Sequence, residues 1–144
     1  MHPPLKRFRN ARVPGDRRGA ALAEFAIVAP VFFLFVLGIV EFGRAMMVQT
    51  LLTNAAQLGA RAGALDGAQA SDVTSTVNNY LANAGISGAT STPSPNPPSS
   101  ANPGTDIKVT VTVPYKSVSL LSTPRFLGST TLSATALVQR ETEQ

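Results

Sequence analysis

The side chain with the clearest chemical consequence in this sequence is the carboxylate of Glu24. It is the only charged group in the apolar run from Ala21 to Val40. A carboxylate within a bilayer is costly, and the cost falls towards the interface. Two roles are open for Glu24: its charge is compensated by a partner, or it lies at headgroup level and reaches out to water.

The other reactive residue types indicate no catalysis. The chain has no Cys and a single His, His2. Cys/His zinc sites, disulfides, thiol nucleophiles and a Ser-His-Asp triad built on a structured histidine are therefore excluded. Asp66 and Asp72 flank an expected turn without a third metal ligand nearby, and no Gly-rich phosphate loop is present. We expect a protein that is not an enzyme and that uses no metal, cofactor or small-molecule substrate.

The apolar run predicts a membrane span. About 20 residues at about 1.5 Å rise cross the ~30 Å hydrocarbon core of a bilayer. A buried core helix is the alternative, but a helix that is apolar on all faces needs a larger protein around it than the rest of these 144 residues supplies. The segment after the run, beginning at Glu41, lacks the small-residue pattern of an ordinary signal-peptide cleavage site.

The net charge of +4 is concentrated at one end of the chain. Residues 1–19 hold six of the 12 Lys and Arg residues but only one of the eight acids. No basic face remains for nucleic acid in the rest of the chain. By the positive-inside rule, we expect a single-pass membrane protein with its N-terminus in the cytoplasm and its C-terminal part exported.

The sequence GDRRGAALAEFAIVAP, which leads into the apolar run, resembles a type IV prepilin signal. The resemblance implies that a membrane aspartyl peptidase, the prepilin peptidase, cuts between Gly19 and Ala20 and leaves the apolar helix attached. Glu24 would then be the fifth residue of the mature chain. The partner implied for it is the new α-amino group of Ala20 in a neighbouring subunit, which would set the axial register.

The helix is expected to continue beyond the membrane. Ala20 to Leu65 contains 46 residues, about 69 Å if unbroken, with a possible kink at Pro30. Gly59 and Gly63 lie four residues apart in an Ala-rich stretch. Such small residues permit close helix packing, and two partners are open: another helix, or the C-terminal domain of the same chain.

Two segments together, AEFAIVAPVFFLFVLGIVEFGRAM and TNAAQLGARAGAL, resemble the N-terminal signature of TadE-like proteins, the minor pseudopilins of tight-adherence (Flp-type) pilus systems. The resemblance covers about residues 17–65. It implies processing after Gly19, anchoring by the adjacent helix in the bacterial cytoplasmic (inner) membrane, and a part in assembling a pilus for surface adherence, with other pilin or pseudopilin subunits as partners. The family motif often has Glu-Tyr where this chain has Glu24-Phe25.

The remaining residues predict a small exported domain. A break at 66–70 is followed by a helix that Ser71 caps and that ends near Gly85. The Pro- and Ser-rich stretch 87–105 is expected to be an extended, mobile spacer. Ile107–Val113 alternates strictly and predicts a half-buried strand, and Thr131–Gln139 predicts a final one. Tyr115 to Leu121 is either a weaker strand or an irregular crossing, and Pro124 breaks it.

These elements predict an α+β, pilin-like fold: a long N-terminal transmembrane helix that continues into a small exported domain with a short second helix and a two- to three-stranded antiparallel sheet. The expected divisions are a basic cytoplasmic leader (1–19), the transmembrane helix and its extension (20–66), and the exported domain (67–144). The expected function is that of a minor pseudopilin, with the prepilin peptidase, other subunits and membrane lipid as partners. The alternative is an uncleaved signal-anchor envelope protein whose exported domain binds a glycan or protein partner.

Overall fold

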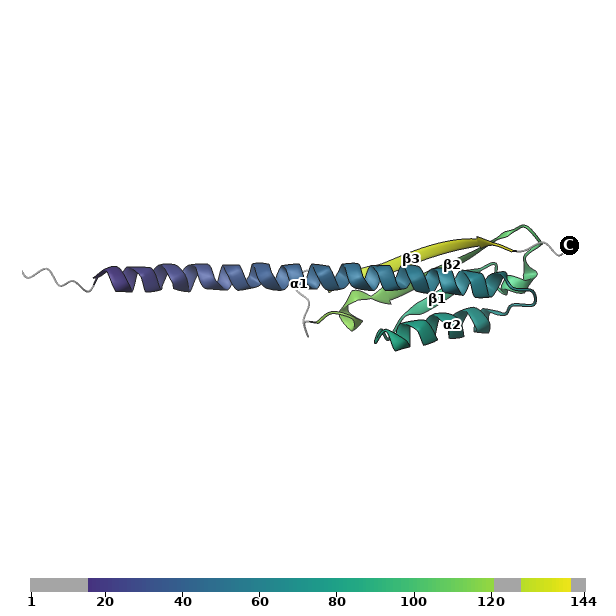
Figure 1. Cartoon of the computed structure of the whole chain (residues 1–144), viewed down its shortest axis with the longest axis horizontal. Helices are drawn as coiled ribbons and strands as arrows, with labels where there is room; N and C mark the ends of the chain where they lie inside the picture. The colour runs from purple at the N-terminus through teal and green to yellow at the C-terminus, as the bar shows by residue number, and fades with distance from the viewer. Residues whose placement is uncertain (1–15, 121–127, 141–144) are drawn as a thin grey trace, which may run out of the picture. The chain divides into compact units, whose positions relative to one another are not determined.

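One helix, α1 (Asp16–Ala64), contains 49 residues and extends through both the apolar run and the segment that follows it (Figure 1). The structure is a computed structural model that describes residues 16–120 and 128–140, with side chains from residue 19 onward. The chain divides into two units, Met1–Leu37 and Gly38–Gln144, and each is described by itself. Residues 1–15 of the expected leader and Pro124 lie outside the described residues.

In the first unit, α1 presents apolar side chains outward along its length. Among residues 19–37, only Ala29 is even half-buried. The helix is long and apolar enough to cross a membrane, and its most apolar part is almost entirely exposed. Pro30 lies inside the helix. An apolar surface of this extent is unfavourable in water, which favours a single-pass membrane anchor.

The second unit confirms the predicted α+β fold. It holds the rest of α1, a second helix α2 (Ala70–Asn83), and three strands: β1 (Thr90–Ser94), β2 (Asp106–Pro114) and β3 (Thr131–Gln139). The strands form an antiparallel sheet in the order β1-β2-β3. Figure 1 shows the sheet and α2 alongside the C-terminal part of α1. The expected strands 107–113 and 131–139 correspond to β2 and β3.

The core of this unit forms where α1, α2 and the inner face of the sheet meet. Strict alternation along β2 sends every second side chain inward, and α2 contributes residues at helical spacing. The side chains that α1 contributes are mostly small, which lets the helix lie close to the sheet. The fully buried members are Val48, Leu52, Ala55, Ala56, Ala60, Val73, Val77, Leu81, Ile107, Val109, Val111, Val113 and Tyr115.

The connection after β2 is irregular. Residues Tyr115–Ser117 form a short 3-10 helix, η2, so the weaker-strand alternative for 115–121 is wrong over its described part. Pro114 ends β2, and the Tyr115 amide donates to the carbonyl of Thr130 at 2.9 Å just before β3. The Tyr115 side chain is fully buried in the core.

The Pro-rich stretch 87–105 is structured, contrary to the expectation of a mobile spacer. It contains β1, which pairs with β2 over five residues, and the 3-10 helix η1 (Pro98–Ser100). Pro93, Pro98 and Ala101 are buried. The high Pro content predicted a segment without regular structure. Proline is tolerated in an edge strand, however, and β1 is at the edge of the sheet.

The expected cap at Ser71 is wrong, because the N-cap of α2 is Gln69 and Ser71 lies inside the helix. The backbone amide of Gln69 donates to the Asp72 carboxylate at 2.8 Å, which is one half of a capping-box arrangement. The Asp72 carboxylate therefore stabilises the N-terminus of the helix. The chain turns at Gly85, whose φ of 73° is favourable for glycine.

Candidate processing and packing sites

The predicted processing residues all lie in the first turns of the apolar helix. Gly19, Ala20, Glu24 and Phe25 belong to α1 and are exposed. A Cβ built on Gly19 would meet no atom within 4 Å. Ala20 and Glu24 are four residues apart and thus share one helix face. In the part of the chain that the structure describes, no hydrogen bond or ion pair engages the Glu24 carboxylate, which leaves it available to a partner outside the chain.

The two glycines predicted for close packing lie against the chain's own domain. A Cβ on Gly59 would be 2.7 Å from Cγ2 of Val77 and 3.3 Å from Cγ1 of Val109. A Cβ on Gly63 would be 3.0 Å from Cγ2 of Ile107. These glycines therefore allow α1 to approach α2 and β2 at a distance that a side chain would prevent. Of the two partners left open by the sequence, the structure places the domain of the same chain here.

A buried polar cluster joins α1 to η2, and sequence reasoning missed it. Glu41 is 5% exposed, although it is a carboxylate. The Tyr115 hydroxyl donates to the backbone oxygen of Glu41 at 2.8 Å and also to its carboxylate. The Ser119 hydroxyl donates to Oε1 of Glu41 at 2.6 Å. One helical turn further on, Nε of Arg44 donates to the carbonyl of Val118 at 3.1 Å.

The cluster's electrostatics follow from burial. Desolvation, the hydrogen bond to Glu41 and the negative charge of that carboxylate raise the pKa of Tyr115 to about 12, while Arg44 acts in the opposite direction. A neutral phenol that donates to a carboxylate is thus the stable form up to alkaline pH. The sequence signal was weak, because Glu41 and Arg44 resembled ordinary charges flanking a membrane span and Tyr115 is 74 residues away.

A second polar contact fixes the end of the sheet. Nη2 of Arg140 lies 2.7 Å from Oδ1 of Asp66, and Nη1 donates to the carbonyl of Ser99 at 3.0 Å and to that of Ala101. Asp66 thus has a cation as its partner. Within residues 16–120 and 128–140, no group of three His, Cys, Asp or Glu side chains is placed to hold a metal ion.

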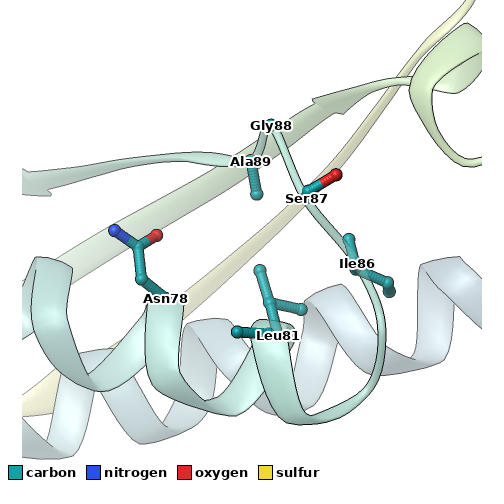
Figure 2. Close-up of a pocket in the computed structure, with 7 residues that line it drawn as sticks. Asn78, Leu81, Ile86, Ser87, Gly88 and Ala89 are labelled. Atoms are coloured by element: carbon teal, nitrogen blue, oxygen red, sulfur yellow. The ribbon is translucent and has the colours of Figure 1, made fainter.

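A small pocket lies between the end of α2 and the start of β1. Figure 2 shows Leu81, Ile86 and Ser87 among the residues around it, with Asn78 at the side. Its volume is about 250 Å³, and no charged or aromatic side chain lines it. Ligand sites usually enclose about 300–1,000 Å³ and orient their ligands with aromatic and polar groups. The pocket therefore adds no support to the glycan-binding alternative.

A comparison with protein families bears on the N-terminal helix. Residues 19–61 match the family model described as TadE-like protein. The resemblance predicted from the sequence is thereby confirmed for this segment, which we call the TadE-like segment. No match to the chain was found among curated proteins or among solved structures.

The TadE-like segment begins at Gly19, the residue after which cleavage is expected. It includes Glu24, Glu41 and Gly59 but ends before α2 and the sheet. The hydroxyls of Tyr115 and Ser119 therefore lie outside the TadE-like segment, although they bind a carboxylate within it.

Proposed function

We propose that this protein is a non-enzymatic minor pseudopilin that takes part in assembling a tight-adherence (type IVb, Flp-type) pilus for surface adherence. A prepilin peptidase cuts it between Gly19 and Ala20. The observation that carries the proposal is the start of the TadE-like segment at Gly19, in the first turns of α1 and at the beginning of its exposed apolar run. The mature chain stays anchored in the inner membrane by that helix, with the exported unit outside the cytoplasm.

Glu24 has the role of a subunit contact in this proposal. Its carboxylate lies on an exposed helix face among apolar side chains. The cleaved chain gains an α-amino group at Ala20, and the corresponding amine of a neighbouring subunit supplies a positive charge that compensates Glu24. This pairing lets the apolar helices of adjacent subunits pack in one axial register. Phe25, exposed beside it, contributes apolar contact.

Processing is tested by the mass and N-terminal sequence of the membrane-extracted chain, expressed with and without a prepilin peptidase. The proposal requires a chain that begins at Ala20 only when the peptidase is present. Gly19→Leu should block this cleavage and impair piliation. Gly43→Leu is the matched control, because a Cβ at Gly43 also meets no atom within 4 Å. Normal piliation by the Gly19 variant would refute the proposal.

The role of Glu24 has its own test. Glu24→Gln should still be cleaved, because the bond between Gly19 and Ala20 is unchanged, but its incorporation with other subunits should fall. The readout is crosslinking between subunits in the membrane, compared with the native chain. The signal-anchor alternative would be favoured by two results together. The chain would remain uncut but anchored in the membrane, and the Glu24 variant would crosslink to other subunits as the native chain does.

A further inference from the structure

Residues 115–119, which follow β2, are held by hydrogen bonds on the part of α1 that comes directly after the apolar run. Glu41 comes directly after Val40, the last residue of the run. Tyr115 and Ser119 donate hydrogen bonds to Glu41, and Arg44 donates to the carbonyl of Val118. Four residues of helix rise only about 6 Å. Residues 115–119 are therefore tied to the first helical turn after the apolar run.

The surface around this tie combines apolar side chains with cations. Leu120 is 64% exposed, next to residues 115–119, and Phe42, Met46 and Met47 are exposed on the adjoining turns of α1. Lys116 is exposed and Arg44 is half-buried. We call residues 42–47 together with 115–120 the anchor-side end.

Exposed carboxylates lie elsewhere in the unit. Among the described residues from 38 onward, the acids are Glu41, which is buried, and Asp66, Asp72 and Asp106. Asp66 and Asp72 flank the turn after α1, and Asp106 begins β2 at the end opposite Pro114. The anchor-side end thus has positive charge and exposed apolar groups, with no exposed carboxylate among its residues.

We propose that the anchor-side end docks on the membrane that the apolar run crosses, with the Leu120 side chain at the acyl boundary and Lys116 and Arg44 at anionic lipid phosphates. Three observations lead to this partner: Glu41 follows the apolar run directly in the sequence, the exposed charge is positive, and exposed apolar side chains lie among the same residues. The docking would limit the orientations of the exported unit. It requires the membrane anchor but neither cleavage at Gly19 nor a pilus.

A nitroxide label tests the position of Leu120. The chain contains no Cys, so Leu120→Cys gives one attachment site in the full chain. Leu65→Cys is the matched control, because Leu65 is an apolar residue of similar exposure, 66% against 64%, directly after the last residue of α1. The labelled chains are reconstituted in vesicles of phosphatidylglycerol and phosphatidylcholine. Collision rates with oxygen and with a water-soluble nickel chelate are then measured.

The expected result is a severalfold higher ratio of oxygen to nickel collisions at position 120 than at position 65. Equal, water-like ratios at both positions would overturn the proposal. A label at 120 shielded from both reagents would also overturn it, because that pattern indicates a protein partner in place of lipid.

The charge requirement is tested with Lys116→Glu on the Leu120→Cys background. Lys108→Glu, which changes an exposed lysine on β2, is the control. In phosphatidylglycerol-containing vesicles, the ratio at position 120 should fall severalfold for the Lys116 variant and stay unchanged for the Lys108 variant. Equal ratios in the Lys116 and Lys108 variants would refute recognition of anionic phosphate. A ratio at position 120 that is as high in pure phosphatidylcholine as in phosphatidylglycerol-containing vesicles would also refute it. Hydrogen exchange of the β2 amides verifies that each variant remains folded.

Discussion

The hydroxyl of Tyr115 donates to both the backbone oxygen and the carboxylate of Glu41, a residue 74 positions earlier in the chain. Glu41 is 5% exposed and Tyr115 is fully buried. A carboxylate in such a place is stable only if hydrogen-bond donors replace the water it has lost. Ser119 supplies another donor. This relationship ties the connection after β2 to the helix and leads to the first prediction.

Tyr115→Phe should lower the free energy of unfolding of the second unit by about 1–3 kcal/mol, because a buried carboxylate loses a donor while the ring remains in place. The measurement is denaturant unfolding of the full chain in detergent, followed by circular dichroism of the sheet. Tyr80→Phe is the control, since the Tyr80 hydroxyl accepts only an exposed hydrogen bond from Asn54 at 3.3 Å. Equal losses in the two variants would contradict the assigned role.

Stability should also depend on alkaline pH through Tyr115. Its pKa is about 12 in the folded chain, against about 10 for an ordinary tyrosine. Because the folded-state pKa is raised, the stabilisation is fully present below about pH 10 and is lost as the pH rises towards 12. Tyr115→Phe should remove this dependence. Absorbance of tyrosinate in a Tyr80→Phe background, where Tyr115 is the only tyrosine, measures the titration directly; a midpoint near 10 would disprove it.

The glycines of α1 offer a matched pair of substitutions. Gly59→Ala should destabilise the second unit by about 1–3 kcal/mol, because the new methyl group would lie 2.7 Å from Val77 Cγ2 in a packed core. Gly43→Ala, with no atom within 4 Å, should be neutral or stabilise the helix by about 0.5–1 kcal/mol. Thermal unfolding of both variants in detergent gives the comparison. A harmless change at Gly59 would show that the contact relaxes freely.

The contacts of Arg140 give a further contrast. Arg140→Met should increase proteolysis of residues 98–104, because the guanidinium donates to the carbonyls of Ser99 and Ala101. Asp66→Asn should change stability by less than about 1 kcal/mol, since Asp66 is 74% exposed and exposed ion pairs contribute little. Limited proteolysis with mass spectrometry separates the two variants. Equal sensitivity would mean that the ion pair, and not the backbone contacts, holds this segment.

Local patterns in the sequence predicted most elements of the fold. The alternation in Ile107–Val113 identified β2 within one residue at each end, and the final strand 131–139 coincides with β3. The long helix was also predictable, since one apolar run and its small-residue extension lie in continuous sequence. These elements depend on periodicity, which a single segment carries by itself.

Features that depend on distant residues could not be predicted in the same way. The stretch 87–105 was expected to be a mobile spacer, but β1 forms there because β2 offers it a partner strand. Gly59 and Gly63 had two possible partners in the sequence, and only the packing of β2 and α2 distinguishes them. Glu41 had no local sign of burial, because its hydroxyl donors come from residues 115 and 119.

The order of the elements along the chain also bears on how the protein is made. The apolar run leaves the ribosome early, whereas β3, which pairs with β2 over nine residues, comes close to the C-terminus. Domains generally fold as their residues emerge. In the topology proposed above, the sheet is incomplete while the anchor enters the bilayer, so the Ile and Val face of β2 would cross the membrane in an extended chain and be buried only after export.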